Sequence, residues 1–161
     1  MQFLDAIKKV ESDDCFSQPK GSYLVHGFLS VDDGKRSEWQ IGYYDPKADT
    51  ITAYIFEDGE IVRSEPAEVF KKGSRVERLD RSKVSISAEK ALDKAEKLRE
   101  KKYSAHPVSK VILLLQKLPL GQVYNITMVT KTFNMMNVKI SSETGKTLEE
   151  SFSSLMELKE N

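Results

Sequence analysis

The chain has 161 residues, of which 39% are hydrophobic and 31% are charged. This composition is typical of a folded domain and excludes disorder over most of the length. Basic and acidic residues both number 25, so no global charge draws the chain to nucleic acid or to an anionic membrane. The N-terminus lacks the pattern of a signal peptide, and the apolar run at residues 111–115 is too short to span a bilayer. Cys15, the single cysteine, suits a reducing compartment, so we expect a cytoplasmic protein without membrane contact.

The first half of the sequence predicts one helix followed by an antiparallel meander. Phe3, Ile7 and Val10 recur at helical spacing, which indicates a short helix at the N-terminus. Strand patterns follow at residues 23–31, 38–45, 50–57 and 60–64. Asp58-Gly59 lies between the last two and predicts a hairpin, because a type I′ turn needs positive φ, which glycine adopts at low cost.

The second half begins after a charged connector, residues 71–83, which carries six basic and two acidic residues. Residues 87–103 predict the clearest helix, with Ser87 as its N-cap and an alanine-rich apolar stripe. Another helix is predicted to open at Pro107. Its expected buried stripe is Val108, Val111, Ile112 and Leu115. Strands are predicted between residues 122 and 155, and the last gives way to a short terminal helix.

The two halves have the same order of patterns. A shift of 85 residues brings Trp39 onto Tyr124, and one further residue brings Gly59 onto Gly145. We therefore expect an α+β fold of two repeats packed into one body, each a helix plus an antiparallel β-meander. The expected repeats span residues 1–70 and 84–161, joined by the connector 71–83. Their expected junction consists of Phe70, Val76, Phe152, Leu155 and Met156.

A family resemblance lies in two segments of the second half, ISAEKALDKAEKL and YNITMVTKTFNMMNVKISSETGKTL. They resemble the helix and the final hairpin of the PepSY domain, and the first half is similar more weakly. The resemblance implies PepSY-like, cystatin-like repeats, in which a helix lies on a curled antiparallel sheet, and a role in binding or inhibition. It implies no catalytic residue, because the matching positions, among them Ala91, Tyr124 and Gly145, pack or turn the chain.

Few residues could carry catalysis or bind a metal. A structural zinc site needs about four Cys or His ligands, while this sequence offers Cys15, His26 and His106. The carboxylates of Asp13 and Asp14 would raise the pKa of the Cys15 thiol, which disfavours a nucleophile paired with His26. We therefore predict no catalytic residue, no metal and no cofactor.

The strand aromatic residues point to binding. The alternation of residues 38–45 places Tyr44 on the face opposite Trp39. An exposed aromatic side chain on a sheet can anchor a partner, and Tyr44 is the one expected to be exposed. For a partner that binds at this sheet, Trp39, Tyr44 and Tyr124 are the candidate binding residues. A peptide can also add to a sheet edge as a further strand. We predict a non-enzymatic binding or regulatory protein whose partner is a protein or peptide.

Two other functions stay open. The concave face of the sheet could hold a small ligand or the substrate of an enzyme. Residues 71–102, the connector and the Lys-rich helix, carry twelve basic and six acidic residues and could bind nucleic acid. The interleaved acids favour ion pairs within a solvated helix instead. Self-association is also left open.

Overall fold

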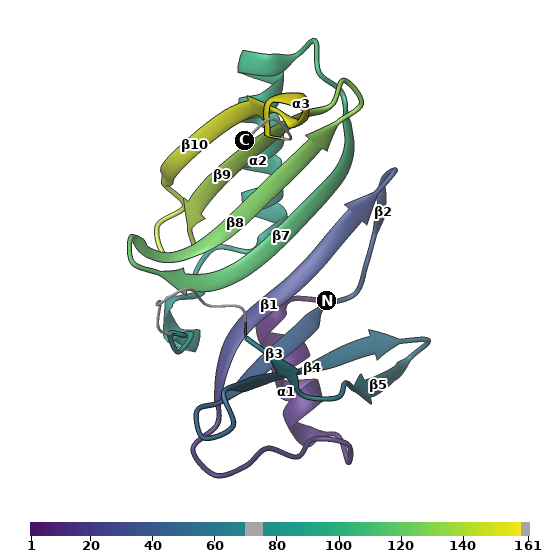
Figure 1. Cartoon of the computed structure of the whole chain (residues 1–161), viewed down its shortest axis with the longest axis vertical. Helices are drawn as coiled ribbons and strands as arrows, with labels where there is room; N and C mark the ends of the chain where they lie inside the picture. The colour runs from purple at the N-terminus through teal and green to yellow at the C-terminus, as the bar shows by residue number, and fades with distance from the viewer. Residues whose placement is uncertain (70–75, 159–161) are drawn as a thin grey trace.

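The computed structural model describes residues 1–69 and 76–158. Its helices are α1 (Phe3–Ser12), the 3-10 turn η1 (Arg81–Lys83), α2 (Ala88–Tyr103) and α3 (Leu155–Leu158). Its strands are β1 (Tyr23–Asp32), β2 (Lys35–Arg36), β3 (Gln40–Asp45), β4 (Thr50–Glu57), β5 (Glu60–Arg63), β6 (Ala67–Glu68), β7 (Val108–Leu118), β8 (Gly121–Thr130), β9 (Asn134–Ser141) and β10 (Thr147–Ser154). The strands form one antiparallel sheet in the order β10-β9-β8-β7-β1-β3-β4-β5, with β2 and β6 added at β1 and β4 (Figure 1).

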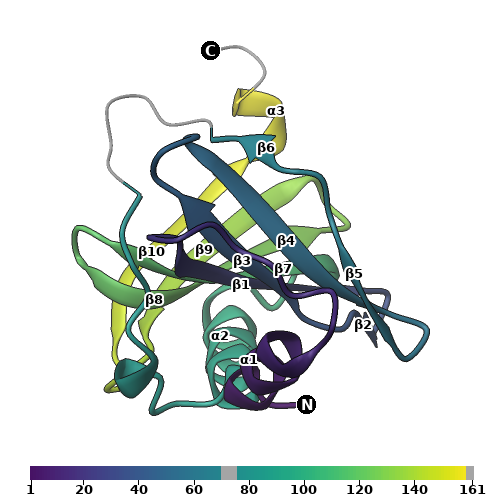
Figure 2. The same ribbon diagram turned by 90° about the horizontal axis from the view of Figure 1, so that it is seen from below.

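The two long helices lie on the same face of the sheet (Figure 2). Their buried residues pack with alternate residues of the strands into one hydrophobic core. Buried core residues of the helices are Phe3, Ala6, Ile7, Val10, Ala88, Ala91 and Ala95, and those of the central strands include Leu29, Ile41, Leu113 and Ile126. Alanine dominates the buried stripe of α2, which lets the helix backbone approach the sheet closely.

Several local predictions are confirmed. The helix predicted from Ser87 onward is α2, and the Ser87 hydroxyl accepts a hydrogen bond from the Lys90 N–H at 3.2 Å. The predicted hairpin joins β4 and β5, where Asp58 and Gly59 have φ angles of 50° and 82°. Both features depend on residues close in sequence, which is why the sequence alone predicts them.

The predicted fold class, two repeats that each have a helix and their own meander, is wrong. The strands of both halves belong to a single sheet, because β1 pairs with β7 along seven residue pairs. Gly59 and Gly145 do lie in connections between consecutive strands, with φ angles of 82° and 77°. The connections differ, however, since two residues join β4 to β5 and five join β9 to β10. Alternation and turn glycines occur in any antiparallel sheet, so they do not by themselves define a repeat.

The helix predicted after Pro107 is also wrong, because these residues form β7. The segment contains the unbroken apolar run 111–115. Such a run fits a strand with apolar side chains on both faces as well as it fits a buried helix. Here Leu113 and Leu115 enter the core below the sheet, while Ile112 and Leu114 are half-buried on the other face.

The junction between the halves differs from the predicted one. Phe70 lies outside the described residues. Phe152 stacks on Tyr103 within the second half, and Met156 is 63% exposed. The halves instead meet where β1 and β7 pair, because two strands that would otherwise present open edges satisfy each other's backbone groups there.

Candidate functional site

The three aromatic residues predicted to bind a partner are buried. Trp39 is 1% exposed and donates its Nε1–H to the Met1 carbonyl at 3.0 Å. Tyr124 is fully buried, and Tyr44 donates its hydroxyl proton to Asp49 Oδ1 at 2.5 Å. Trp39 and Tyr124 belong to the core between the sheet and the helices, whereas Tyr44 does not. The fold therefore does not bring the three rings together on one surface.

The titratable residues considered for chemistry are also apart. Burial, followed by the Asp13 carboxylate, raises the pKa of the Cys15 thiol. Burial among the strands lowers the pKa of His26 to about 4, so its imidazole is neutral at pH 7. His106 lies elsewhere, with Nδ1 2.6 Å from Thr132 Oγ1. Residues 1–69 and 76–158 contain no cluster of three or more His, Cys, Asp or Glu side chains that could hold a metal.

The two edges of the sheet differ in length and chemistry. β5 forms one edge with only four residues and carries charges at both ends, Glu60 and Arg63. β10 forms the other edge with eight residues, and no described strand pairs with its outer side. Its charged residues Glu149 and Glu150 and a register shift between Thr147 and Glu149 lie in its first half, whereas residues 151–154 carry no charge and no proline. The β10 edge is therefore the longer of the two, and its second half is the less protected part.

The hydrogen bonding of β10 identifies which backbone groups point outward. In an antiparallel pair, a residue bonds to its neighbour through both N–H and C=O, and the next residue directs both groups the other way. The Leu155 N–H donates to the Phe133 carbonyl at 2.8 Å. By alternation back to the register shift, the backbone N–H and C=O groups of Ser153, Ser151 and Glu149 also point toward β9. Glu150 and Phe152 therefore direct both their N–H and C=O groups away from the sheet, and Ser154, which precedes α3, directs its N–H away.

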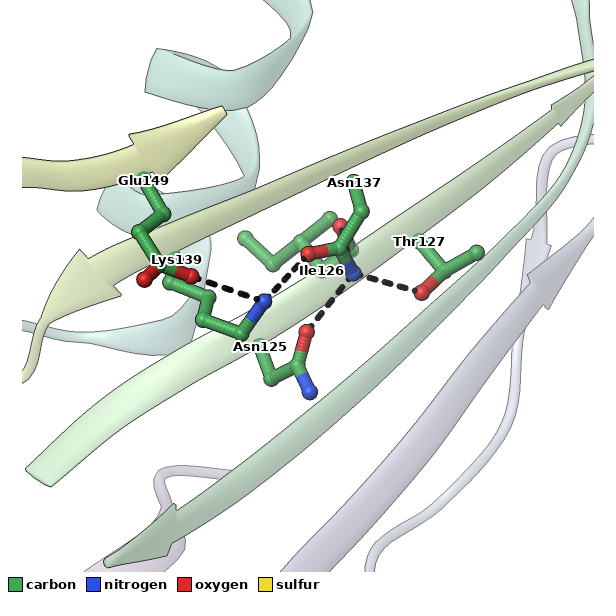
Figure 3. A network of polar contacts seen from close by, with 6 residues as sticks. All are labelled: Asn125, Ile126, Thr127, Asn137, Lys139 and Glu149. Carbon is green, nitrogen blue, oxygen red and sulfur yellow. Dashed lines mark hydrogen bonds and ion pairs between the residues drawn. The ribbon is translucent and has the colours of Figure 1, made fainter. Parts of the chain in front are cut away.

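A polar network borders this edge on the face opposite the helices, here called the open face (Figure 3). Asn137 donates through Nδ2 to Asn125 Oδ1 at 2.7 Å and to Thr127 Oγ1 at 3.0 Å. Lys139 donates to Asn137 Oδ1 at 2.9 Å and lies 3.3 Å from Glu149 Oε2. Because these residues come from β8, β9 and β10, the network links the last three strands and fixes the position of the edge.

Helix α2 holds the other flank of β10. The rings of Tyr103 and Phe152 are stacked, with centroids 4.1 Å apart and an interplanar angle of 11°. Glu150 accepts hydrogen bonds from Lys102 Nζ at 2.7 Å and from the Tyr103 hydroxyl at 2.9 Å. The edge strand therefore has an aromatic, ion-paired flank on the helix face and a polar flank on the open face.

We expect Glu150→Gln to destabilise the protein by about 1 kcal/mol at pH 7, since hydrogen bonds to a charged group are lost. The Lys102 ammonium, with the Tyr103 hydroxyl, holds the pKa of Glu150 below its ordinary 4.5. A pKa lowered by folding adds stability above the unfolded value, and this stability is lost as the pH falls through the folded pKa. Urea unfolding should therefore separate the two proteins at pH 7 and not at pH 3. A difference that persists at pH 3 would contradict the assignment.

The position of this site could not be predicted from the sequence. The strand predicted near residues 146–155 is confirmed by β10, but strand order decides which strand forms an edge. That order follows from the pairing of β1 with β7, which no local pattern encodes. The one local signal was the three serines at positions 151, 153 and 154, which follow the charged pair Glu149 and Glu150.

Comparisons with known proteins bear on the fold alone. No family model matches the sequence, and no curated protein is significantly similar to it. The structure is similar to a crystal structure from Clostridium difficile 630 described as a "putative lipoprotein", with a TM-score of 0.62 and 15% sequence identity. The similarity covers 95% of this chain and 93% of that one. In the described part of this chain, no helix is both long and apolar enough to cross a membrane.

Proposed function

We propose that the protein is a non-enzymatic binding protein that accepts an extended segment of a partner protein along the outer edge of β10. The observation that carries the proposal is the row of outward N–H groups at Glu150, Phe152 and Ser154, with the outward C=O groups of Glu150 and Phe152. No strand of the described residues uses these groups. A peptide that adds as a further strand would satisfy them through main-chain hydrogen bonds.

The flanks of β10 define the chemistry of the partner. Successive side chains of an added strand point to opposite faces of the sheet. Those on the helix face would lie beside Phe152, which supports an apolar or aromatic residue there. Those on the open face would lie beside Ser151 and Ser153, next to the Lys139–Glu149 pair. We therefore expect a segment that alternates apolar and polar residues.

The experiment selects random peptides by display against the full chain and compares their affinity for two variants. Glu150→Pro removes the outward N–H at the centre of the edge, because proline has no amide proton. Glu150→Ala removes the same side-chain contacts and keeps that N–H, so it is the matched control. We expect the proline variant to bind the selected peptides about tenfold more weakly or worse, and the alanine variant to bind within about threefold of the parent.

Three outcomes would overturn the proposal. The first is that selection yields no binding peptide. The second is equal affinity of the parent and Glu150→Pro, with circular dichroism showing that both are folded. The third is that the parent is a dimer in sedimentation experiments while Glu150→Pro is a monomer, since the edge would then already be occupied by a second copy.

The other sequence-based expectations stay predictions. These are the PepSY resemblance, the cytoplasmic location, the small-ligand or enzymatic use of the concave face, and nucleic-acid binding through the basic connector. The buried positions of Trp39, Tyr44 and Tyr124 are the reason that the proposed contact surface uses β10 in their place.

A further inference from the structure

The end of the charged connector is fixed against the sheet. The Leu79 N–H donates to the Leu24 carbonyl at 2.9 Å, and the Leu79 side chain is buried in the core. The next residue, Asp80, is held at both backbone groups by the buried Gln122 side chain. Its N–H donates to Gln122 Oε1 at 2.8 Å, and its carbonyl accepts from Gln122 Nε2 at 2.9 Å. This part of the connector is therefore a preformed element.

Four cations converge where this element meets the β7–β8 hairpin. Arg78, Arg81 and Lys83 from the connector and Lys117 from β7 line a cavity of about 520 Å³. Among the residues that the structure describes, Asp80 is the one carboxylate residue that lines it. Side chains alternate along β7, so Lys117 lies on the same side of the sheet as Leu113 and Leu115, which pack in the core between the sheet and the helices. This cavity is therefore separate from the open face.

Both arginines are held in place by side chains of the first half. Arg81 makes a two-point ion pair with Glu11, in which Nη1 lies 3.0 Å from Oε2 and Nη2 contacts Oε1. The Arg78 guanidinium lies over the ring of Tyr23, 4.9 Å from the ring centroid. A guanidinium that stacks on an aromatic ring keeps its edge donors available for an anion.

The two lysines give the cavity a positive charge that Asp80 offsets only in part; hydrogen bonds from Ser82 and, to a smaller extent, the Lys83 ammonium lower the pKa of this carboxyl. Within residues 1–69 and 76–158, neither Lys83 nor Lys117 has a carboxylate within ion-pair distance of its ammonium group. The Asp80 carboxylate accepts hydrogen bonds from the Ser82 N–H at 2.9 Å and the Ser82 hydroxyl at 2.6 Å. Positive charges gathered around one cavity raise the local concentration of anions there.

We propose that this cavity binds a small phosphate ester, with the phosphate between Lys83, Lys117 and Arg78. Arginine and lysine together suit a tetrahedral group with two negative charges, because one supplies a planar fork of donors and the other a point charge. A neighbouring cavity of about 380 Å³ shares Arg78, Leu79 and Arg81 and has a mixed lining that includes the rings of Phe16 and Tyr43 and the polar side chains of Glu11 and Gln18. The organic part of the ester lies in that second cavity, against the two rings. This inference does not depend on the β10 edge.

The test titrates phenyl phosphate into the full chain by calorimetry at low salt and pH 7. We expect Lys117→Glu to weaken binding about tenfold or more, since a phosphate contact becomes a repulsion. Lys110→Glu is the matched control, because it makes the same charge change on the same strand, at an exposed residue 3.8 Å from Asp32 Oδ1. It should bind within about threefold of the parent. Lys83→Glu, at an exposed residue, repeats the test if Lys117→Glu fails to fold.

Two further titrations test whether the phosphate group comes from a small ester, from free phosphate or from a lipid headgroup. Inorganic phosphate should bind more weakly than phenyl phosphate, because it leaves the second cavity empty. Vesicles of phosphatidylcholine with phosphatidic acid test a lipid source. Retention on these vesicles without binding of phenyl phosphate would overturn the inference. So would the absence of any binding by the parent protein, or an equal loss in Lys110→Glu and Lys117→Glu, which would indicate diffuse electrostatics.

Discussion

Trp39→Ala is expected to lower the free energy of unfolding by about 3–5 kcal/mol, the usual cost of removing a large buried aromatic side chain. Trp39 is 1% exposed, and its ring meets that of Phe3 edge-on with centroids 5.1 Å apart. Its indole N–H also donates to the Met1 carbonyl. The substitution therefore leaves a cavity between α1 and the sheet and removes a hydrogen bond that fixes the start of the chain. Urea unfolding followed by circular dichroism measures the effect.

Phe133→Ala is the matched control. Phe133 is another aromatic residue, but it is 66% exposed in the turn between β8 and β9. We expect its replacement to change stability by no more than about 0.5 kcal/mol. If Trp39→Ala had an equally small effect, Trp39 would not be a core residue and the position of α1 on the sheet would be wrong.

Cutting the chain between Arg81 and Ser85 is expected to abolish the stable fold of both fragments. The cut separates β1 from β7, whose seven residue pairs join the two halves of the sheet. Each fragment would then expose a long, unpaired strand and half of the shared core. The ion pair between Arg81 and Glu11 stays within the first fragment after the cut. When the fragments are mixed, pairing of β1 with β7 should restore cooperative unfolding.

Thermal melts of the fragments, alone and mixed in equal amounts, decide this prediction. Recovery on mixing supports a single cooperative sheet. Two fragments that each melt cooperatively, with no change on mixing, would mean that the halves are independent units and that the β1–β7 pairing contributes little to stability. Uncut protein carried through the same melts controls for irreversible aggregation.

What the sequence predicts well is local. The N-cap at Ser87 and the turn at Asp58-Gly59 each depend on residues that are neighbours in the chain. The same reasoning failed for residues 108–118, because an apolar run carries no period that separates a buried helix from a strand with two apolar faces. Burial of Tyr44 was missed for a related reason, since its face is occupied by a neighbouring ring, that of Tyr23, which only strand pairing brings close.

The candidate sites needed the tertiary structure. The basic connector was evident in the sequence, but Lys117 joins it only because the β7–β8 hairpin folds against Asp80. In the same way, Glu150 and Phe152 are ordinary strand residues until the order of strands places β10 at the end of the sheet. Patterns along the chain predict elements, whereas edges and cavities arise from contacts between distant residues.

Amide hydrogen exchange, measured residue by residue with a display-selected peptide present and absent, tests the β10 edge most directly. In the free protein, the amides of Glu150, Phe152 and Ser154 should exchange fast, while those of Ser151 and Ser153, which face β9, should be protected. We expect the peptide to slow exchange at the three outward amides and to leave the inward ones unchanged. Peptide binding that leaves Glu150, Phe152 and Ser154 fast, and slows amides elsewhere, would contradict it.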